Sequence, residues 1–183
     1  MWEVVKIPVE RLEPGAFSPF GHVIRTFEER KPDVAKGGHR SNEYSVIAEP
    51  GAEPKDGPAW YQAHPDRVPI SEGLQRAHFA FHTDAGQSFY PKLHSPSVFL
   101  VGPVQDDIRA GELRAFYSDG DTGVCLHLKV WHTMPICVSG RDIYQTTRGD
   151  QDYLEHSVEI DFDLERGQSI EPDMDNFSGW PKK

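Results

Sequence analysis

Two short stretches of the chain carry histidines beside polar side chains that could take part in proton transfer. In the first, FHTDAGQSFYP (Phe81 to Pro91), His82 and Gln87 stand on either side of a four-residue polar turn. If the stretch is a β-hairpin, both side chains reach one face at neighbouring positions. An imidazole titrates near neutral pH and an amide both donates and accepts hydrogen bonds, so one interpretation is that the pair faces a functional site. The alternative is that His82 and Gln87 only hydrogen-bond to each other across the turn.

The second stretch, CLHLKVWH (Cys125 to His132), alternates in the manner of a β-strand. With a period of two, one face of this strand carries Cys125, His127, Lys129 and Trp131. An imidazole, an amine and an indole together suit the wall of a pocket better than bulk solvent. On a regular strand His127 and His132 cannot both face that pocket, although a β-bulge near Trp131 would allow it.

A divalent transition metal is a further expectation, because two imidazoles from different strands and one oxygen ligand suit such an ion. The candidate ligands are His82, Gln87 and His127. Gln87 is a neutral group at a place where a carboxylate is the more usual ligand. The sequence has no HExxH motif, no cysteine cluster, no P-loop and no nucleophile elbow.

Short apolar runs separated by breaks rich in glycine and proline recur along the 183 residues, which include 16 Gly and 15 Pro. This spacing predicts an all-β protein, a sandwich or a barrel, with roughly ten short strands. The predicted strands are 4–9, 22–27, 43–48, 77–82, 87–93, 97–104, 113–118, 125–132, 136–140, 142–147 and 156–162. The one helical prediction is a short turn between Pro14 and Gly21.

The length suits one domain, 1–183, with a well-filled core. Within it we expect N-terminal strands and the helical turn over 1–30, an exposed loop over 49–58, and an acidic C-terminal tail over 165–183. The formal net charge of -10 argues against nucleic acid as a partner. The sequence has neither a secretory signal nor the run of ~20 apolar residues that a membrane helix needs. We therefore expect a cytoplasmic protein that binds a small molecule.

In several sequence motifs the chain resembles the ureidoglycolate lyase family of cupin-like proteins. These motifs are AFSPFGHVI (Ala16 to Ile24), H-x4-Q-x-F-x-P (His82 to Pro91), LRAF (Leu113 to Phe116), G-V-x-x-H-x-x-x-W-H (Gly123 to His132) and Arg148-Gly149. The resemblance implies a single-domain, all-β, cupin-type double-stranded β-helix, a jelly-roll-like barrel. We expect a homodimer, because such barrels commonly cover edge strands with a partner.

The resemblance also implies an activity, cleavage of the carbon–nitrogen bond of ureidoglycolate to glyoxylate and urea, in allantoin degradation and purine metabolism. Such a lyase needs a base for the hydroxyl proton, an acid for the departing nitrogen, and a cation or metal for the carboxylate. The expected catalytic residues are His82, His127, Lys129 and His132. The expected substrate-binding residues are Gln87, Phe89, Tyr90, Trp131 and Arg148. Arg148 or Lys129 is the expected partner of the substrate carboxylate.

The chain departs from the family pattern at KGGHRSNEYSVIA (Lys36 to Ala48) and at YQAHP (Tyr61 to Pro65), and with these changes it loses a carboxylate-binding arginine. Two alternatives therefore stay open. One is a lyase or dehydratase of the same fold for a bulkier substrate, with Phe89, Tyr90 and Trp131 shaping a roomier pocket. The other is a non-catalytic cupin that binds a small molecule.

Overall fold

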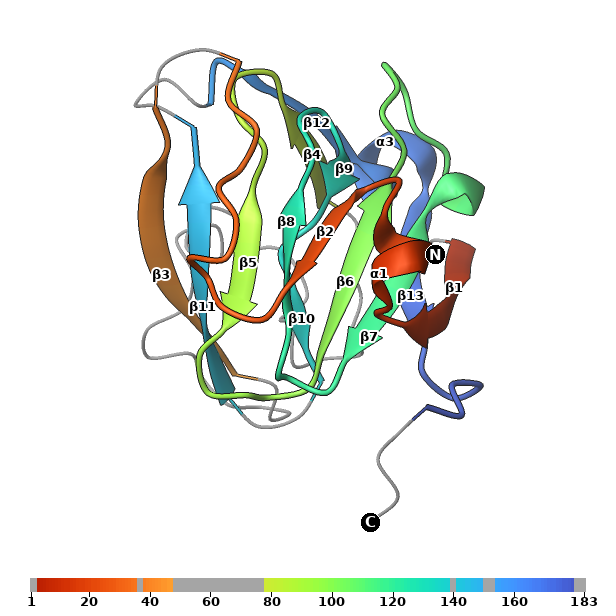
Figure 1. Cartoon of the computed structure of the whole chain (residues 1–183). Helices are drawn as coiled ribbons and strands as arrows, with labels where there is room; N and C mark the ends of the chain where they lie inside the picture. The colour runs from red at the N-terminus through yellow and green to blue at the C-terminus, as the bar shows by residue number, and fades with distance from the viewer. Residues whose placement is uncertain (1–2, 36–37, 48–77, 139–140, 150–153, 180–183) are drawn as a thin grey trace.

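The computed structural model describes residues 3–35, 38–47, 78–138, 141–149 and 154–179, and the loop expected at 49–58 lies outside them (Figure 1). Within these ranges the chain forms two β-sheets that face each other, with two short α-helices and one 3-10 turn at the periphery. The predicted all-β, cupin-like fold is confirmed. No helix among the described residues is long and apolar enough to cross a membrane.

The strands fall into a larger and a smaller sheet. The larger sheet has the order β12 (Ser157–Asp161), β4 (His78–His82), β9 (Trp131–His132), β6 (Ser97–Gly102), β7 (Arg114–Ser118), β1 (Glu3–Arg11) and β13 (Gln168–Asp173), with β10 (Ile136–Cys137) also paired to β6. The smaller sheet has the order β2 (Gly21–Ile24), β8 (Gly123–Leu126), β5 (Ser88–Pro91), β11 (Arg141–Arg148) and β3 (Arg40–Ile47). The helical elements are α1 (Pro14–Phe17), η1 (Ala110–Glu112) and α3 (Phe162–Arg166). Each predicted strand overlaps an observed one, and α1 confirms the predicted helical turn.

Alternation along β4 sends its side chains to two different environments. Phe79 and Phe81 join a buried cluster on one face of the larger sheet, where the Phe81 ring meets the Trp131 ring edge-on at 4.7 Å between centroids. His78, Ala80 and His82 alternate with them and face the other way. On the face toward the smaller sheet, Phe99 and other residues of the larger sheet pack against Phe89 of the smaller one. His82 is therefore directed into the space between the sheets.

The stretch from Phe81 to Pro91 is not the predicted hairpin. β4 pairs with β12 and β9 in the larger sheet, whereas β5 pairs with β11 and β8 in the smaller one. Residues 83–87 therefore cross from one sheet to the other. Backbone hydrogen bonds hold this crossing segment, from Gly86 N to Asp33 O at 2.6 Å and from Ala35 N to Asp84 O at 2.9 Å.

The predicted strand 125–132 is also two strands in different sheets. β8 ends at Leu126 and β9 begins at Trp131, and between them Val130 N donates to His127 O at 3.3 Å to close a turn, with Lys129 at a φ of 64°. The face that was expected to carry Cys125, His127, Lys129 and Trp131 therefore does not exist. Lys129 is exposed, whereas Trp131 is 2% exposed in the core.

The two crossing segments lie side by side. Leu126 N donates to Gln87 O at 2.7 Å, and Lys129 N donates to His82 O at 3.2 Å. The backbone on both sides of each crossing is thus tied to the other crossing. This arrangement fixes the positions from which His82, Gln87 and His132 extend.

The described part of the expected acidic tail, 165–179, belongs to the fold. α3 ends at Gly167, whose left-handed φ of 65° is a typical helix terminator. β13 then runs parallel to β1, with Ile170 fully buried opposite Val5. The acidic side chains of this segment alternate with buried ones, so the segment covers an edge of the larger sheet.

Candidate active site

His82, Gln87 and His132 meet in the space between the two sheets, beside the crossing segments. Gln87 Oε1 lies 3.2 Å from His82 Nε2 and 2.6 Å from His132 Nε2. The two imidazole rings are 5.3 Å apart between centroids. All three side chains are buried, with 7%, 8% and 7% of their surface exposed. The predicted contact between His82 and Gln87 is therefore present, and His132 completes an inner cluster of these three residues.

Neighbouring strands hold each member of the inner cluster on its far side. Ser157 Oγ on β12 lies 2.8 Å from His82 Nδ1, and the Val130 carbonyl accepts from His132 Nδ1 at 2.8 Å. The other end of the Gln87 amide lies 3.2 Å from Thr146 Oγ1 on β11. The Phe89 ring packs 5.7 Å from the His132 ring. Three strands from the two sheets and the turn before β9 thus position the three side chains of the inner cluster.

Burial keeps both imidazoles neutral. The pKa of His132 is lowered to about 3, chiefly by desolvation; the nearby His82 and His78 add to this effect, and the hydrogen bond to Val130 opposes it. Desolvation is also the largest cause that lowers the pKa of His82, and the hydrogen bond to Gln87 opposes it. Two neutral imidazoles at pH 7 are proton acceptors, which is the state that a general base requires.

His127 belongs to a second, outer cluster. Its Nδ1 lies 3.1 Å from Asp33 Oδ2, and its ring meets the His22 ring edge-on at 4.9 Å between centroids. Burial lowers the pKa of His22, and the charge of Arg30 adds to this effect. The Asp33 carboxylate holds the His127 ring in the outer cluster, so His127 has different partners from the residues of the inner cluster.

The other predicted site residues are dispersed. The Trp131 indole donates to Gln105 O at 2.9 Å from the far face of its strand, and Tyr90 donates to Arg25 O at 2.8 Å. Both side chains bond to backbone carbonyls outside the inner cluster, whereas the Phe89 ring packs against the inner cluster. Arg148 is half-buried at the end of β11, with its Nε 3.0 Å from the Asn42 amide oxygen.

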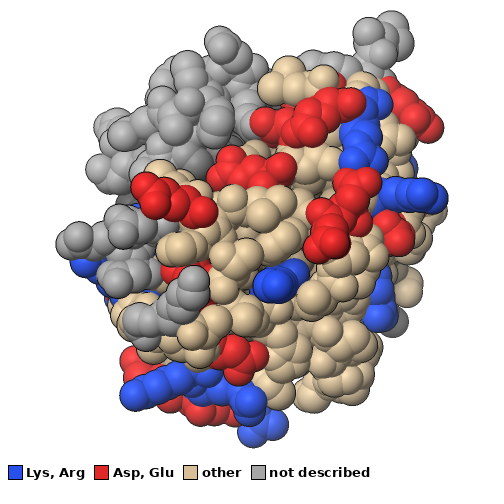
Figure 2. All heavy atoms as spheres, turned by 90° about the horizontal axis from the view of Figure 1, so that it is seen from above, with Lys and Arg blue, Asp and Glu red and all other residues tan. Residues whose placement is uncertain are grey.

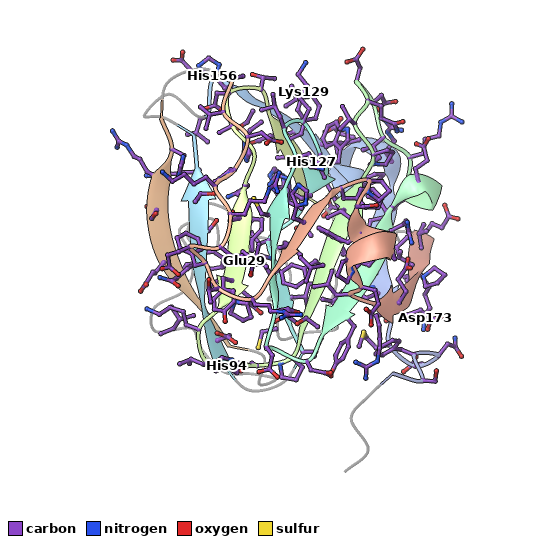
Figure 3. The ribbon with its side chains drawn as sticks, in the orientation of Figure 1. Glu29, His94, His127, Lys129, His156 and Asp173 are labelled. Atoms are coloured by element: carbon purple, nitrogen blue, oxygen red, sulfur yellow. The ribbon has the colours of Figure 1, made fainter. Side chains whose placement is uncertain are left out.

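Lys129 lies at the end of the barrel where both crossing segments pass, together with His127 and His156 (Figure 3). Figure 2 shows this end from outside, where acidic side chains border an uncharged area and basic groups stand between them. Over a chain with a formal net charge of -10, an anionic ligand is attracted only where a local cation offsets the field.

Sequence reasoning missed Thr146 and Ser157. Both lie on predicted strands, 142–147 and 156–162, but nothing in either strand separates them from other small polar residues. Ser157 stands directly opposite His82 in the pairing of β12 with β4. Only this register, set by long-range strand pairing, brings Ser157 to the site.

The expected metal ligands do not form a metal site in this arrangement. His127 bonds to Asp33 rather than lying with His82 and Gln87. The 2.6 Å between Gln87 Oε1 and His132 Nε2 is a direct hydrogen-bond distance. Two neighbouring ligands bonded at about 2.1 Å to one ion lie roughly 3.0 to 3.4 Å apart in octahedral or tetrahedral geometry. Among the residues that the structure describes, no three His, Cys, Asp or Glu side chains converge to hold a metal.

Comparison with known proteins identifies the family of the chain. The sequence model of the family described as ureidoglycolate lyase matches residues 4–162, a range that includes every member of the inner cluster. This chain belongs to the ureidoglycolate lyase family. The resemblance seen in the sequence motifs is thereby confirmed.

Individual members of the family are similar over most of their length. A ureidoglycolate lyase of Pseudomonas savastanoi pv. phaseolicola is 30% identical over 139 residues, 75% of this chain and 79% of the relative. A ureidoglycolate lyase of Pseudomonas entomophila is 30% identical over 136 residues, 73% of this chain and 78% of the relative.

Proposed function

We propose that this protein is a lyase that cleaves the carbon–nitrogen bond of ureidoglycolate to give glyoxylate and urea. The observation that carries the proposal is the buried pair of neutral imidazoles, His82 and His132, joined through Gln87.

The reaction moves one proton and consumes none. The reacting carbon of ureidoglycolate bears a hydroxyl, a carboxylate and a urea nitrogen. A neutral imidazole of the pair takes the hydroxyl proton, and the electrons of that O–H bond form the carbonyl of glyoxylate. The carbon–nitrogen bond breaks and its electron pair stays on the urea nitrogen. The imidazolium then returns its proton to that nitrogen, which releases urea and restores the neutral base.

A cation must hold the substrate carboxylate. We propose Arg148 for this role, because it ends β11 two residues after Thr146, which contacts Gln87. A guanidinium can bind a carboxylate through two parallel hydrogen bonds. Lys129 is a second candidate, since its backbone bonds to His82. Replacing Lys129 with Met raises the KM strongly if Lys129 serves as this cation, and an unchanged KM excludes the role.

We also propose that the protein works as a homodimer in the cytoplasm, in allantoin degradation. β3 and β12 stand at the ends of the described strand orders, and proteins of this kind commonly associate through edge strands. Light scattering of the purified protein measures the oligomeric state, and a monomeric mass would contradict this part of the proposal.

The direct test of the activity is incubation of the purified protein with ureidoglycolate. We expect release of glyoxylate and urea in equal amounts, well above the spontaneous rate. Release at the spontaneous rate alone would refute the proposal. The next hypothesis to test would then be a lyase or dehydratase of the same fold that acts on a bulkier substrate.

A further inference from the structure

The hydrogen bonds around the inner cluster determine which atoms carry hydrogen. A backbone carbonyl can only accept, so the 2.8 Å contact with Val130 O requires a hydrogen on His132 Nδ1. A neutral imidazole carries one ring hydrogen. His132 Nε2 is therefore a bare lone pair that points toward the Gln87 amide.

The atom that this lone pair meets must be a donor. At 2.6 Å, an amide oxygen facing the bare Nε2 would set two lone pairs against each other. The nitrogen and oxygen of a glutamine amide have the same shape and are told apart by their partners. In the neutral state the Gln87 NH2 group therefore faces His132.

The same amide group also sets the tautomer of His82. The second hydrogen of the Gln87 NH2 group is directed to His82 Nε2, at 3.2 Å. That nitrogen then accepts, so the His82 hydrogen is on Nδ1 and is donated to Ser157 Oγ at 2.8 Å. Both imidazoles thus present bare Nε2 atoms to one amide nitrogen.

The far end of the amide requires a donor as well. With its NH2 group facing the imidazoles, the Gln87 carbonyl faces Thr146 Oγ1 at 3.2 Å, and the hydroxyl must donate to it. Thr146 is 4% exposed and buried with the cluster. The competing acceptor for the same hydroxyl hydrogen is Thr147 O, at 3.1 Å.

Two complete networks follow, which differ by one proton, a half-turn of the amide and the tautomer of His82. In the neutral network, Thr146 donates to the Gln87 carbonyl, and the Gln87 NH2 group donates to both imidazoles. After proton uptake on His132 Nε2, the imidazolium donates to the Gln87 oxygen, and His82 donates to the same oxygen with its hydrogen on Nε2 while it accepts from Ser157 Oγ at Nδ1. The NH2 group then donates to Thr146, and Thr146 donates to Thr147 O. A hydroxyl at position 146 satisfies the amide in both networks, because it can donate or accept.

We infer that Thr146 is a positioning residue for the histidine pair, since its hydroxyl sets which end of the Gln87 amide faces His82 and His132. The role deepens the proposed function and rests on it for its effect on the reaction rate. Its structural part, the bare Nε2 atoms of the resting protein, holds for any proton-transfer chemistry at this site.

The first measurement is the tautomer of each imidazole, by long-range proton–nitrogen NMR of protein with labelled histidine at pH 7. We expect His82 and His132 to be neutral, each with a hydrogen on Nδ1 and a bare Nε2. A hydrogen on the Nε2 of either residue in the resting protein overturns the inference. This result does not depend on whether ureidoglycolate is the substrate.

The second measurement compares three variants for glyoxylate release. Thr146→Val keeps the shape and removes the hydroxyl, and we expect it to lower kcat about tenfold with KM within about twofold. Thr146→Ser restores the hydroxyl and should stay within about threefold of the wild type. Thr147→Val is the matched control, because the Thr147 hydroxyl accepts from Ser88 N at 2.8 Å and does not contact the amide.

Two outcomes of this second measurement separate the claims. If Thr146→Val keeps the wild-type kcat, or loses no more than Thr147→Val does, the positioning role is refuted while the proposed function stands. If the wild-type protein releases no glyoxylate, the proposed function fails, and the tautomers measured by NMR still decide the structural part of the inference.

Discussion

The low pKa of His132 predicts a specific loss of stability in mild acid. The pKa is about 3 in the folded protein against 6.5 for an ordinary histidine. Below pH 6.5 the unfolded chain therefore binds a proton that the folded protein excludes, so the free energy of unfolding falls as the pH falls toward 3. Each pH unit in this window costs about 1.4 kcal/mol, and the loss from this one group between pH 7 and pH 5 is about 2 kcal/mol.

The measurement is urea unfolding of the wild type and of His132→Asn at pH 7 and pH 5. The variant is expected to be less stable at pH 7, because Gln87 loses a buried partner, but its stability should fall by about 2 kcal/mol less on acidification. His94→Asn is the control for the loss of an exposed imidazole, since the His94 side chain is 60% exposed. Equal losses in the wild type and in His132→Asn, within about 0.5 kcal/mol, would refute the reasoning from burial.

Three further predictions address the site and its frame. Gln87→Glu replaces the amide with an anion that can only accept hydrogen bonds, so the pKa of both imidazoles rises. The acidic limb of the pH profile of kcat/KM is expected to move up by about 1 to 2 pH units. If this limb does not move, the result counts against the contact between the imidazoles and the amide. Arg148→Gln raises KM about tenfold with kcat within about threefold if Arg148 binds the carboxylate, and an unchanged KM would exclude that role. Gly86→Ala places a Cβ 2.4 Å from the Leu126 carbonyl oxygen, so we expect it to lower the free energy of unfolding by about 1 to 3 kcal/mol. Gly111→Ala, whose Cβ would enter open space, is the control. Equal stabilities of the two variants would contradict the close approach of the two crossing segments.

Sequence reasoning could locate the strands because apolar alternation is a local signal. It wrongly paired β4 with β5 as a hairpin, for a physical reason. The pattern of β4 followed by β5 is the same whether the second strand folds back on the first or crosses to another sheet, and long-range pairing decides between the two. The same ambiguity hid the break between β8 and β9, where the turn closes around Lys129 without a glycine or proline to mark it.

The candidate site could be predicted only where its residues are close in the sequence. His82 and Gln87 are close in the sequence, so either a hairpin or a crossing brings them together. On a regular strand His132 was expected to face away from His127, and it is buried between the sheets, where the site lies. The separation of His127 from this cluster depends on Asp33, which reaches it from a segment 94 positions earlier in the chain.

The most direct test of the central claim is glyoxylate release from ureidoglycolate by three histidine variants of the purified protein. If His82 and His132 carry the proton transfer, His82→Asn and His132→Asn lose about a hundredfold or more in kcat while remaining folded, and the exposed control His94→Asn keeps the wild-type rate. Rates for both inner variants within about threefold of the wild type would contradict the assignment of the chemistry to this pair.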